Sequence, residues 1–150
     1  FKMRDKIIND IMSAMKSKDK DKLSVLRMVK GAIQLEEINK KKNLDDNEVI
    51  AVISKQIKTR KESIVEFTKG NRQDLIAQTE QEIAILQEYM PEQLSDTEIL
   101  AIIDEAIEKI NPQAMSDMGK IMKEINPKLI GKADMSLVSQ LVKEKLSDIK

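Results

Sequence analysis

Apolar residues recur at spacings of three and four along almost the whole chain, and short polar stretches interrupt them. This spacing places apolar side chains on one face of an α-helix, whereas a half-buried strand would need strict alternation. The pattern therefore predicts seven helices and no strand. The predicted helices cover about residues 4–16, 23–39, 46–69, 72–90, 96–110, 117–125 and 135–146.

Residues at the predicted helix ends support these boundaries. Asp45 with Glu48, and Ser95 with Glu98, have the spacing of a capping box, in which each side chain bonds a backbone N–H group of the other residue. Further caps are predicted at Gly70, Asn71, Ser116 and Asp134, and we expect Pro91, Pro112 and Pro127 to end helices.

The apolar stripes also define the expected core. We expect Met12, Met15, Ile38 and Leu137 to be buried with the other residues of their stripes. The aromatic residues Phe67 and Tyr89 fall on stripes as well, which makes them core residues in this interpretation.

Helix length changes around Pro91. The predicted helices before it are long and suit helical hairpins, whereas the three after it are short. We therefore predict two subdomains, at residues 3–92 and 93–149. The expected fold is all-α, with an N-terminal four-helix subdomain packed with a C-terminal three-helix subdomain, because so small a three-helix unit is marginal alone.

Composition agrees with packed helices and limits the function. Hydrophobic residues make up 41% of the chain and aromatic residues 2%, while strands would favour Val, Thr and aromatic residues. The 26 basic and 26 acidic residues cancel, so no global field attracts nucleic acid or membrane. A site for a polyanion must therefore be a local patch.

The chain has no cysteine and no histidine. We therefore expect no disulfide and none of the usual zinc, copper or haem sites, and no cofactor. No apolar run approaches the roughly 20 residues of a membrane span. The amphipathic start also gives no sign of a signal peptide, so we expect a cytoplasmic protein.

Catalytic patterns are weak. Three Ser-x-x-Lys pairs occur, at Ser13/Lys16, Ser17/Lys20 and Ser147/Lys150. They fall in polar turns or at the end of the chain, where a solvated lysine would not deprotonate a serine. The neighbouring acids Glu36-Glu37 and Asp45-Asp46 are better explained by solvation and capping than by acid–base catalysis or Mg²⁺ binding. We expect no enzyme activity.

Three segments are locally basic, at residues 16–30, 55–72 and 120–132. Solvated helix faces explain such runs as well as a binding site does. The third segment flanks breaks at Pro127 and Gly131, where loops can bring lysines together on a phosphate. The candidate contact residues are Lys120, Lys123, Lys128, Lys132, Arg60, Lys61 and Arg72.

The kind of nucleic acid is limited by the scarcity of aromatic residues. With only Phe67 and Tyr89 in the stripes, stacking on splayed bases is not available. Asp134 is placed to cap the last helix, so phosphate contacts should run through Lys128 and Lys132 rather than helix N–H groups. Folded RNA held by about four phosphate contacts would show a salt slope near −3.

Ordered motifs over most of the chain resemble the YqeY proteins, which are related to the tail domain of GatB, a subunit of tRNA-dependent amidotransferase. The motifs are Ala14-Met15-Lys16-Ser17-Lys18-Asp19-Lys20, Gln56-Ile57-Lys58-Thr59-Arg60-Lys61-Glu62-Ser63, Lys69-Gly70-Asn71-Arg72, Tyr89-Met90-Pro91-Glu92-Gln93-Leu94-Ser95, Asp117-Met118-Gly119-Lys120 and Pro127-Lys128-Leu129-Ile130-Gly131-Lys132-Ala133-Asp134. The resemblance runs from about Met3 to Leu146.

The resemblance implies a two-part helical fold whose last three helices match the end of GatB. It implies a non-catalytic, tRNA-gripping module acting free or beside an amidotransferase or an aminoacyl-tRNA synthetase, with Lys120, Lys128, Lys132, Ala133 and Asp134 at the matching positions. Carbon–nitrogen ligase labels in the family come from GatB, and this chain offers no residues for that chemistry. A second interpretation stays open, namely a helical adaptor that receives a partner helix and binds no nucleic acid.

Overall fold

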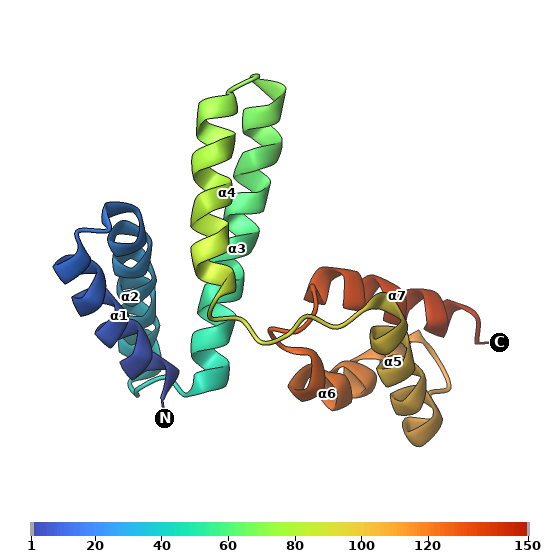
Figure 1. The fold of residues 1–150 in the computed structure, drawn as a ribbon. Helices are drawn as coiled ribbons and strands as arrows, with labels where there is room; N and C mark the ends of the chain where they lie inside the picture. The colour runs from blue at the N-terminus through green and yellow to red at the C-terminus, as the bar shows by residue number, and fades with distance from the viewer. Residues whose placement is uncertain (1, 150) are drawn as a thin grey trace. The chain divides into compact units, whose positions relative to one another are not determined.

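The computed structural model describes residues 2–149, and over that range it is all-helical, with seven α-helices, one short 3-10 turn and no strand (Figure 1). This confirms the all-α prediction. The elements are α1 (Met3–Ser17), α2 (Lys20–Lys40), α3 (Asp46–Lys69), α4 (Gln73–Gln87), α5 (Asp96–Ile110), η1 (Met115–Asp117), α6 (Met118–Leu129) and α7 (Met135–Ser147).

The chain divides into two compact units, one up to Met90 and one from Pro91 onward. In the first unit α1 packs along α2, and α3 lies side by side with α4 (Figure 1). In the second unit α6 contacts both α5 and α7.

Each unit has its own apolar core. In the first unit, Leu26, Val49, Ile53 and Leu86 are completely buried. In the second unit the completely buried residues are Ile103, Ile121, Ile125, Leu129, Val138 and Val142. All of these side chains except Leu129 come from the predicted stripes of α5, α6 and α7.

Short-range signals place several helix ends where the sequence predicts them. Asp45 accepts a hydrogen bond from the Glu48 N–H at 2.8 Å, and the Glu48 side chain accepts one from the Asp45 N–H at 3.2 Å. Ser95 forms the second predicted capping box, and Asp134 caps α7 by accepting from the Ser136 N–H at 2.9 Å.

Two predicted caps, at Asn71 and Ser116, are wrong. Asn71 does not cap α4: it takes a left-handed conformation with φ of 54°, and Arg72 is the N-cap residue, with no capping hydrogen bond from its side chain. Gly70 is the C-cap of α3, as predicted, with φ of −86°, and the left-handed residue of the α3–α4 connection is Asn71. Ser116 does not cap α6 either, because it lies inside the 3-10 turn that leads into that helix.

The prediction that Pro127 ends a helix is wrong, because Pro127 lies within α6. A proline there removes the N–H that would bond the Lys123 carbonyl and crowds that carbonyl. The helix nevertheless continues to Leu129, whose side chain is completely buried in the second core. Burial of this leucine therefore outweighs the local preference of the proline.

The predicted burial of four apolar residues is also wrong. Met12 and Met15 are each 53% exposed, Ile38 is 72% exposed and Leu137 is 38% exposed. Their helices bury other faces, so these positions lie outside the contact. Tyr89, by contrast, is buried as predicted, and its hydroxyl donates to Asp10 at 2.5 Å while Lys6 lies over its ring.

Candidate nucleic-acid interface

The outer face of α6 carries the lysines of the third basic segment. At 100° per residue, Lys120 and Lys123 lie on the side of the helix opposite the buried Ile125 and Leu129, whereas Lys128 lies at the edge of the exposed side, next to the buried Ile121. All three lysine side chains are exposed. The helix therefore presents a basic surface to solvent, which we call the α6 lysine face.

Lys132 lies in the turn that follows α6, and this turn is held by the segment just after Pro91. Gly131 adopts φ of 75°, a left-handed conformation that favours glycine. The Gln93 side chain donates to the Gly131 carbonyl at 2.7 Å, and the Leu94 N–H donates to the Lys132 carbonyl at 2.9 Å. Two contacts from a distant part of the sequence thus fix the backbone that carries Lys132.

Two acids lie among these lysines. Lys120 is 3.5 Å from Asp117, and Lys128 is 3.7 Å from Glu124. These are long pairs, and the Lys120 side chain is 72% exposed, so they hold the ammonium groups only weakly. For Lys123 and Lys132, no ion pair occurs within the described part of the chain.

The carboxylates stay ionised to low pH. The hydrogen bond from the Gln113 N–H, at 2.8 Å, lowers the pKa of Asp117, with a further contribution from Lys120. The pKa of Glu124 is lowered mainly by a hydrogen bond from Lys109, and Lys128 adds to the effect. Both acids therefore carry full charge at neutral pH and offset part of the lysine charge.

Lys109 is a basic residue of this surface that the sequence reasoning missed. It belongs to the last turn of α5, and its ammonium donates to Glu124 at 2.9 Å. Its charge thus lies beside the α6 lysine face. The only sequence signal was a lysine ending the helix before α6, which is also what favourable interaction with the helix dipole produces.

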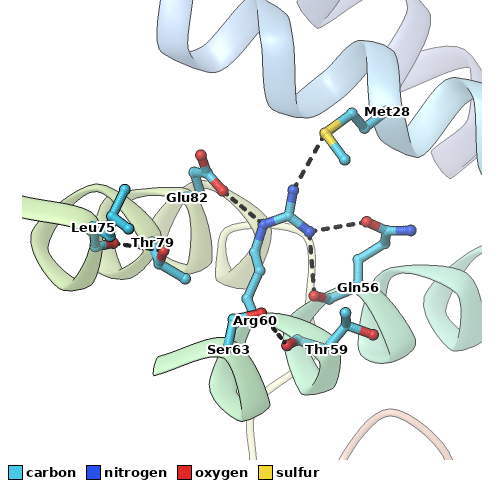
Figure 2. Close-up of polar contacts among 8 residues, drawn as sticks. All are labelled: Met28, Gln56, Thr59, Arg60, Ser63, Leu75, Thr79 and Glu82. Atoms are coloured by element: carbon cyan, nitrogen blue, oxygen red, sulfur yellow. Dashed lines mark hydrogen bonds and ion pairs between the residues drawn. The ribbon is translucent and has the colours of Figure 1, made fainter. Parts of the chain in front are cut away.

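Arg60 does not belong to any exposed surface. Its guanidinium lies between α3, α4 and α2, where it donates to Glu82 at 3.0 Å, to the Gln56 side chain at 2.9 Å and to the Gln56 carbonyl at 3.2 Å (Figure 2). A third nitrogen points to the Met28 sulfur at 3.6 Å. The prediction that Arg60 contacts RNA is therefore corrected: its donors are occupied and its side chain is buried.

The other predicted contacts of the first unit are exposed. Lys61 follows Arg60 on α3 and projects to solvent. Arg72 precedes α4 and pairs with Asp74 at 3.2 Å, and both side chains are more than half exposed. Of the three candidates in the second basic segment, only Lys61 and Arg72 are therefore exposed.

The described residues offer little to other chemistry. Within residues 2–149, no group of three or more His, Cys, Asp or Glu side chains could hold a metal ion, and no helix is long and apolar enough to cross a membrane. The Ser-x-x-Lys pairs at Ser13 and Ser17 are solvent-exposed, and Lys150 of the third pair lies outside the described residues.

Comparison with known proteins identifies relatives over nearly the whole chain. The family model described as Yqey-like protein matches residues 4–146. A Pyrenophora tritici-repentis protein is 31% identical over 144 residues, which is 90% of this chain and 76% of that protein. A Saccharomyces cerevisiae protein is 31% identical over 126 residues, covering 83% of this chain and 66% of the yeast protein. A Vanderwaltozyma polyspora protein is 31% identical over 117 residues, covering 73% and 63%.

All three relatives are named altered inheritance of mitochondria protein 41, mitochondrial. These names contradict the expectation of a cytoplasmic location, which rested on missing targeting signals alone. The names state no enzyme activity and no ligand.

Proposed function

Because this chain belongs to the Yqey-like protein family, we propose that it is a non-catalytic accessory protein that binds folded tRNA through lysine–phosphate contacts. The α6 lysine face and Lys132 form the contact surface. In this proposal the second unit corresponds to the three-helix tail of GatB, and the protein acts free or beside an amidotransferase or aminoacyl-tRNA synthetase.

The observation that carries the proposal is the combination of exposed lysines and a fixed turn. Lys120 and Lys123 share one helix face, Lys128 lies at its edge, and Lys132 follows on a backbone held by Gln93 and Leu94. Lysine ammoniums on rigid elements suit phosphate oxygens, which position a protein on RNA without reading its bases. The surface lacks exposed aromatic rings, which favours duplex regions of a folded RNA over single strands.

Filter binding with bulk tRNA at about 50 mM and about 200 mM salt tests the proposal. About four phosphate contacts give a slope of log K against log salt near −3. Lys128→Ala with Lys132→Ala should reduce the slope to about −1.5 and weaken binding at low salt. The matched control is Lys16→Ala with Lys20→Ala, which removes the same charge from the first unit and should leave the slope unchanged.

Two results would reject the proposal. One is the absence of tRNA binding at low salt, and the other is an equal loss of affinity in both double variants, which would indicate unspecific attraction. If no tRNA binds, the alternative is an adaptor that binds a protein and no nucleic acid. That alternative predicts a partner retained in a pull-down from nuclease-treated lysate.

A further inference from the structure

The side of α2 that faces away from its core carries a row of exposed apolar side chains. Leu35 is 60% exposed, Ile38 is 72% exposed, and Gly31 lies on the same line. Met28 is 54% exposed and lies at the edge of this row, because its sulfur also contacts Arg60 of α3 at 3.6 Å. The spacing of three, four and three residues from Met28 to Ile38 places these α2 residues along one side of the helix. Val29 and Ile33, which are buried, lie on the opposite side. We call this row the α2 stripe.

No close contact within the described fold requires a glycine at position 31. A Cβ atom built on Gly31 would meet nothing within 4 Å, and the residue is in the middle of a 21-residue helix. Glycine weakens a helix interior, so its usual advantage is to allow another backbone to come close. At this position, the only direction left open for such an approach is outward, over the α2 stripe.

A basic row runs beside the α2 stripe. Arg27, Lys30, Gln34 and Lys41 follow one another at spacings of three, four and seven residues along one edge, and none of the three cations forms an ion pair with another described residue. At the end of α2 an open hollow of about 530 Å³ is lined by Ile38, Lys41 and Lys42, and also by the ion-paired Arg4 and Glu37. Apolar surface and positive charge therefore lie next to each other.

We propose that the α2 stripe binds an amphipathic helix of another protein, with an apolar face against Met28, Leu35 and Ile38 and acidic side chains facing the basic row. The backbone of the partner helix would pass closest to α2 at Gly31. Helix-in-groove recognition uses apolar anchors at this spacing, and flanking charges set the choice of partner.

Charge argues against a second copy of this chain as the partner. In an antiparallel pair, each flank meets the same flank of the other helix, so the basic row would face itself. In a parallel pair, Arg27 would face Ala32 and Gln34 would face Asn39 of the other copy, which gives no ion pair. A partner helix with acidic side chains on both flanks can form ion pairs with the basic row whether it runs parallel or antiparallel to α2.

A designed peptide tests the proposal on the full chain. The probe is a fluorescein-labelled peptide of about 21 residues with Leu and Ile at the a and d positions and Glu at e and g, where the glutamates also prevent self-pairing. Fluorescence anisotropy should show saturable binding, at least tenfold tighter than that of the same peptide with Lys in place of Glu.

Substitution of Gly31 separates binding from folding. Gly31→Gln should weaken peptide binding at least tenfold by filling the point of closest approach, while the protein becomes more resistant to urea because Gln is the better helix former. The matched control is Met12→Gln with Met15→Gln, which removes equally exposed apolar side chains from α1 and should leave peptide binding unchanged. Lys128→Ala with Lys132→Ala should also leave it unchanged, so this surface and the tRNA surface can fail separately.

Four results would overturn the proposal. They are no binding of the acidic peptide, equal binding of the basic peptide, retained binding by Gly31→Gln, or a dimer in sedimentation that Leu35→Glu dissolves. Binding of the chain to anionic vesicles that Leu35→Glu abolishes, without peptide binding, would assign the α2 stripe to a membrane surface instead.

Discussion

The buried ion pair of the first unit allows a quantitative test of what holds α3 and α4 together. The Arg60 side chain is 9% exposed and that of Glu82 is 26% exposed, with 3.0 Å between the bonded atoms. Replacing Arg60 with Met keeps much of the aliphatic volume but leaves Glu82 without its cation. Removing one partner of a fully buried pair costs about 3–5 kcal/mol of unfolding free energy.

The expected loss for Arg60→Met is smaller, about 2–3 kcal/mol, because the partly exposed Glu82 carboxylate can be hydrated again. Glu82→Gln should cost less, about 1–2 kcal/mol, since the amide oxygen still accepts from Arg60 and the two bonds to Gln56 remain. In a double-mutant cycle, Arg60→Met with Glu82→Met should lose less than the sum of the single losses, with a coupling of about 1–2 kcal/mol.

Tyr89 provides the assay. It is the only tyrosine of a chain without tryptophan, and it is buried in the core of the first unit. Its fluorescence during urea titration therefore reports that unit without a signal from the second. Arg72→Met is the control, and we expect no measurable change because its pair with Asp74 is exposed. A loss below about 1 kcal/mol for Arg60→Met, or additive single losses, would refute the reasoning.

Three further predictions concern α2, α3 and the Lys132 turn. Gly31→Ala should raise the unfolding free energy by about 0.5–1 kcal/mol in the same urea titration, because the new methyl group meets nothing and glycine is the poorer helix former. Hydrogen bonds led by the one from Lys40 lower the pKa of Glu48 to about 2, so its stabilising effect is complete above the usual pKa of 4.5 and is lost as the pH falls towards 2. The stability difference between the natural chain and Glu48→Gln should shrink over that acid range, and a constant difference would contradict it. Gln93→Ala should weaken tRNA binding severalfold at an unchanged salt slope, because it loosens the turn without removing a cation.

Local signals explain the part of the fold that the sequence predicts correctly. The capping boxes at Asp45 and Ser95 depend only on residues three positions apart, and the helical stripes depend on spacing within one helix. The continuation of α6 through Pro127 was not predictable in this way. It depends on burial of Leu129 among residues of α5 and α7, which no local pattern contains.

In the candidate site, too, features set by local spacing could be predicted, and features set by contacts between helices could not. The spacing of Lys120 and Lys123 on one helix could be read from the sequence, whereas Lys128 was predicted to lie beyond a break at Pro127 and instead belongs to α6. Arg60 could not be distinguished from an exposed arginine, because its partner Glu82 lies on the next helix, 22 residues away. Periodicity also treats every apolar residue of a stripe alike, so it could not tell the buried Ile33 from the exposed Ile38.

The two hydrogen bonds that hold the turn at Gly131 have a consequence for the energetics of recognition. A lysine on a loose loop would lose the conformational entropy of both its backbone and its side chain when it meets a phosphate. Gln93 and Leu94 already restrict the backbone at Gly131 and Lys132 in the free protein, so only side-chain freedom remains to be lost on association. The folding of the second unit thus pre-organises the contact, and a modest number of cations can give useful affinity.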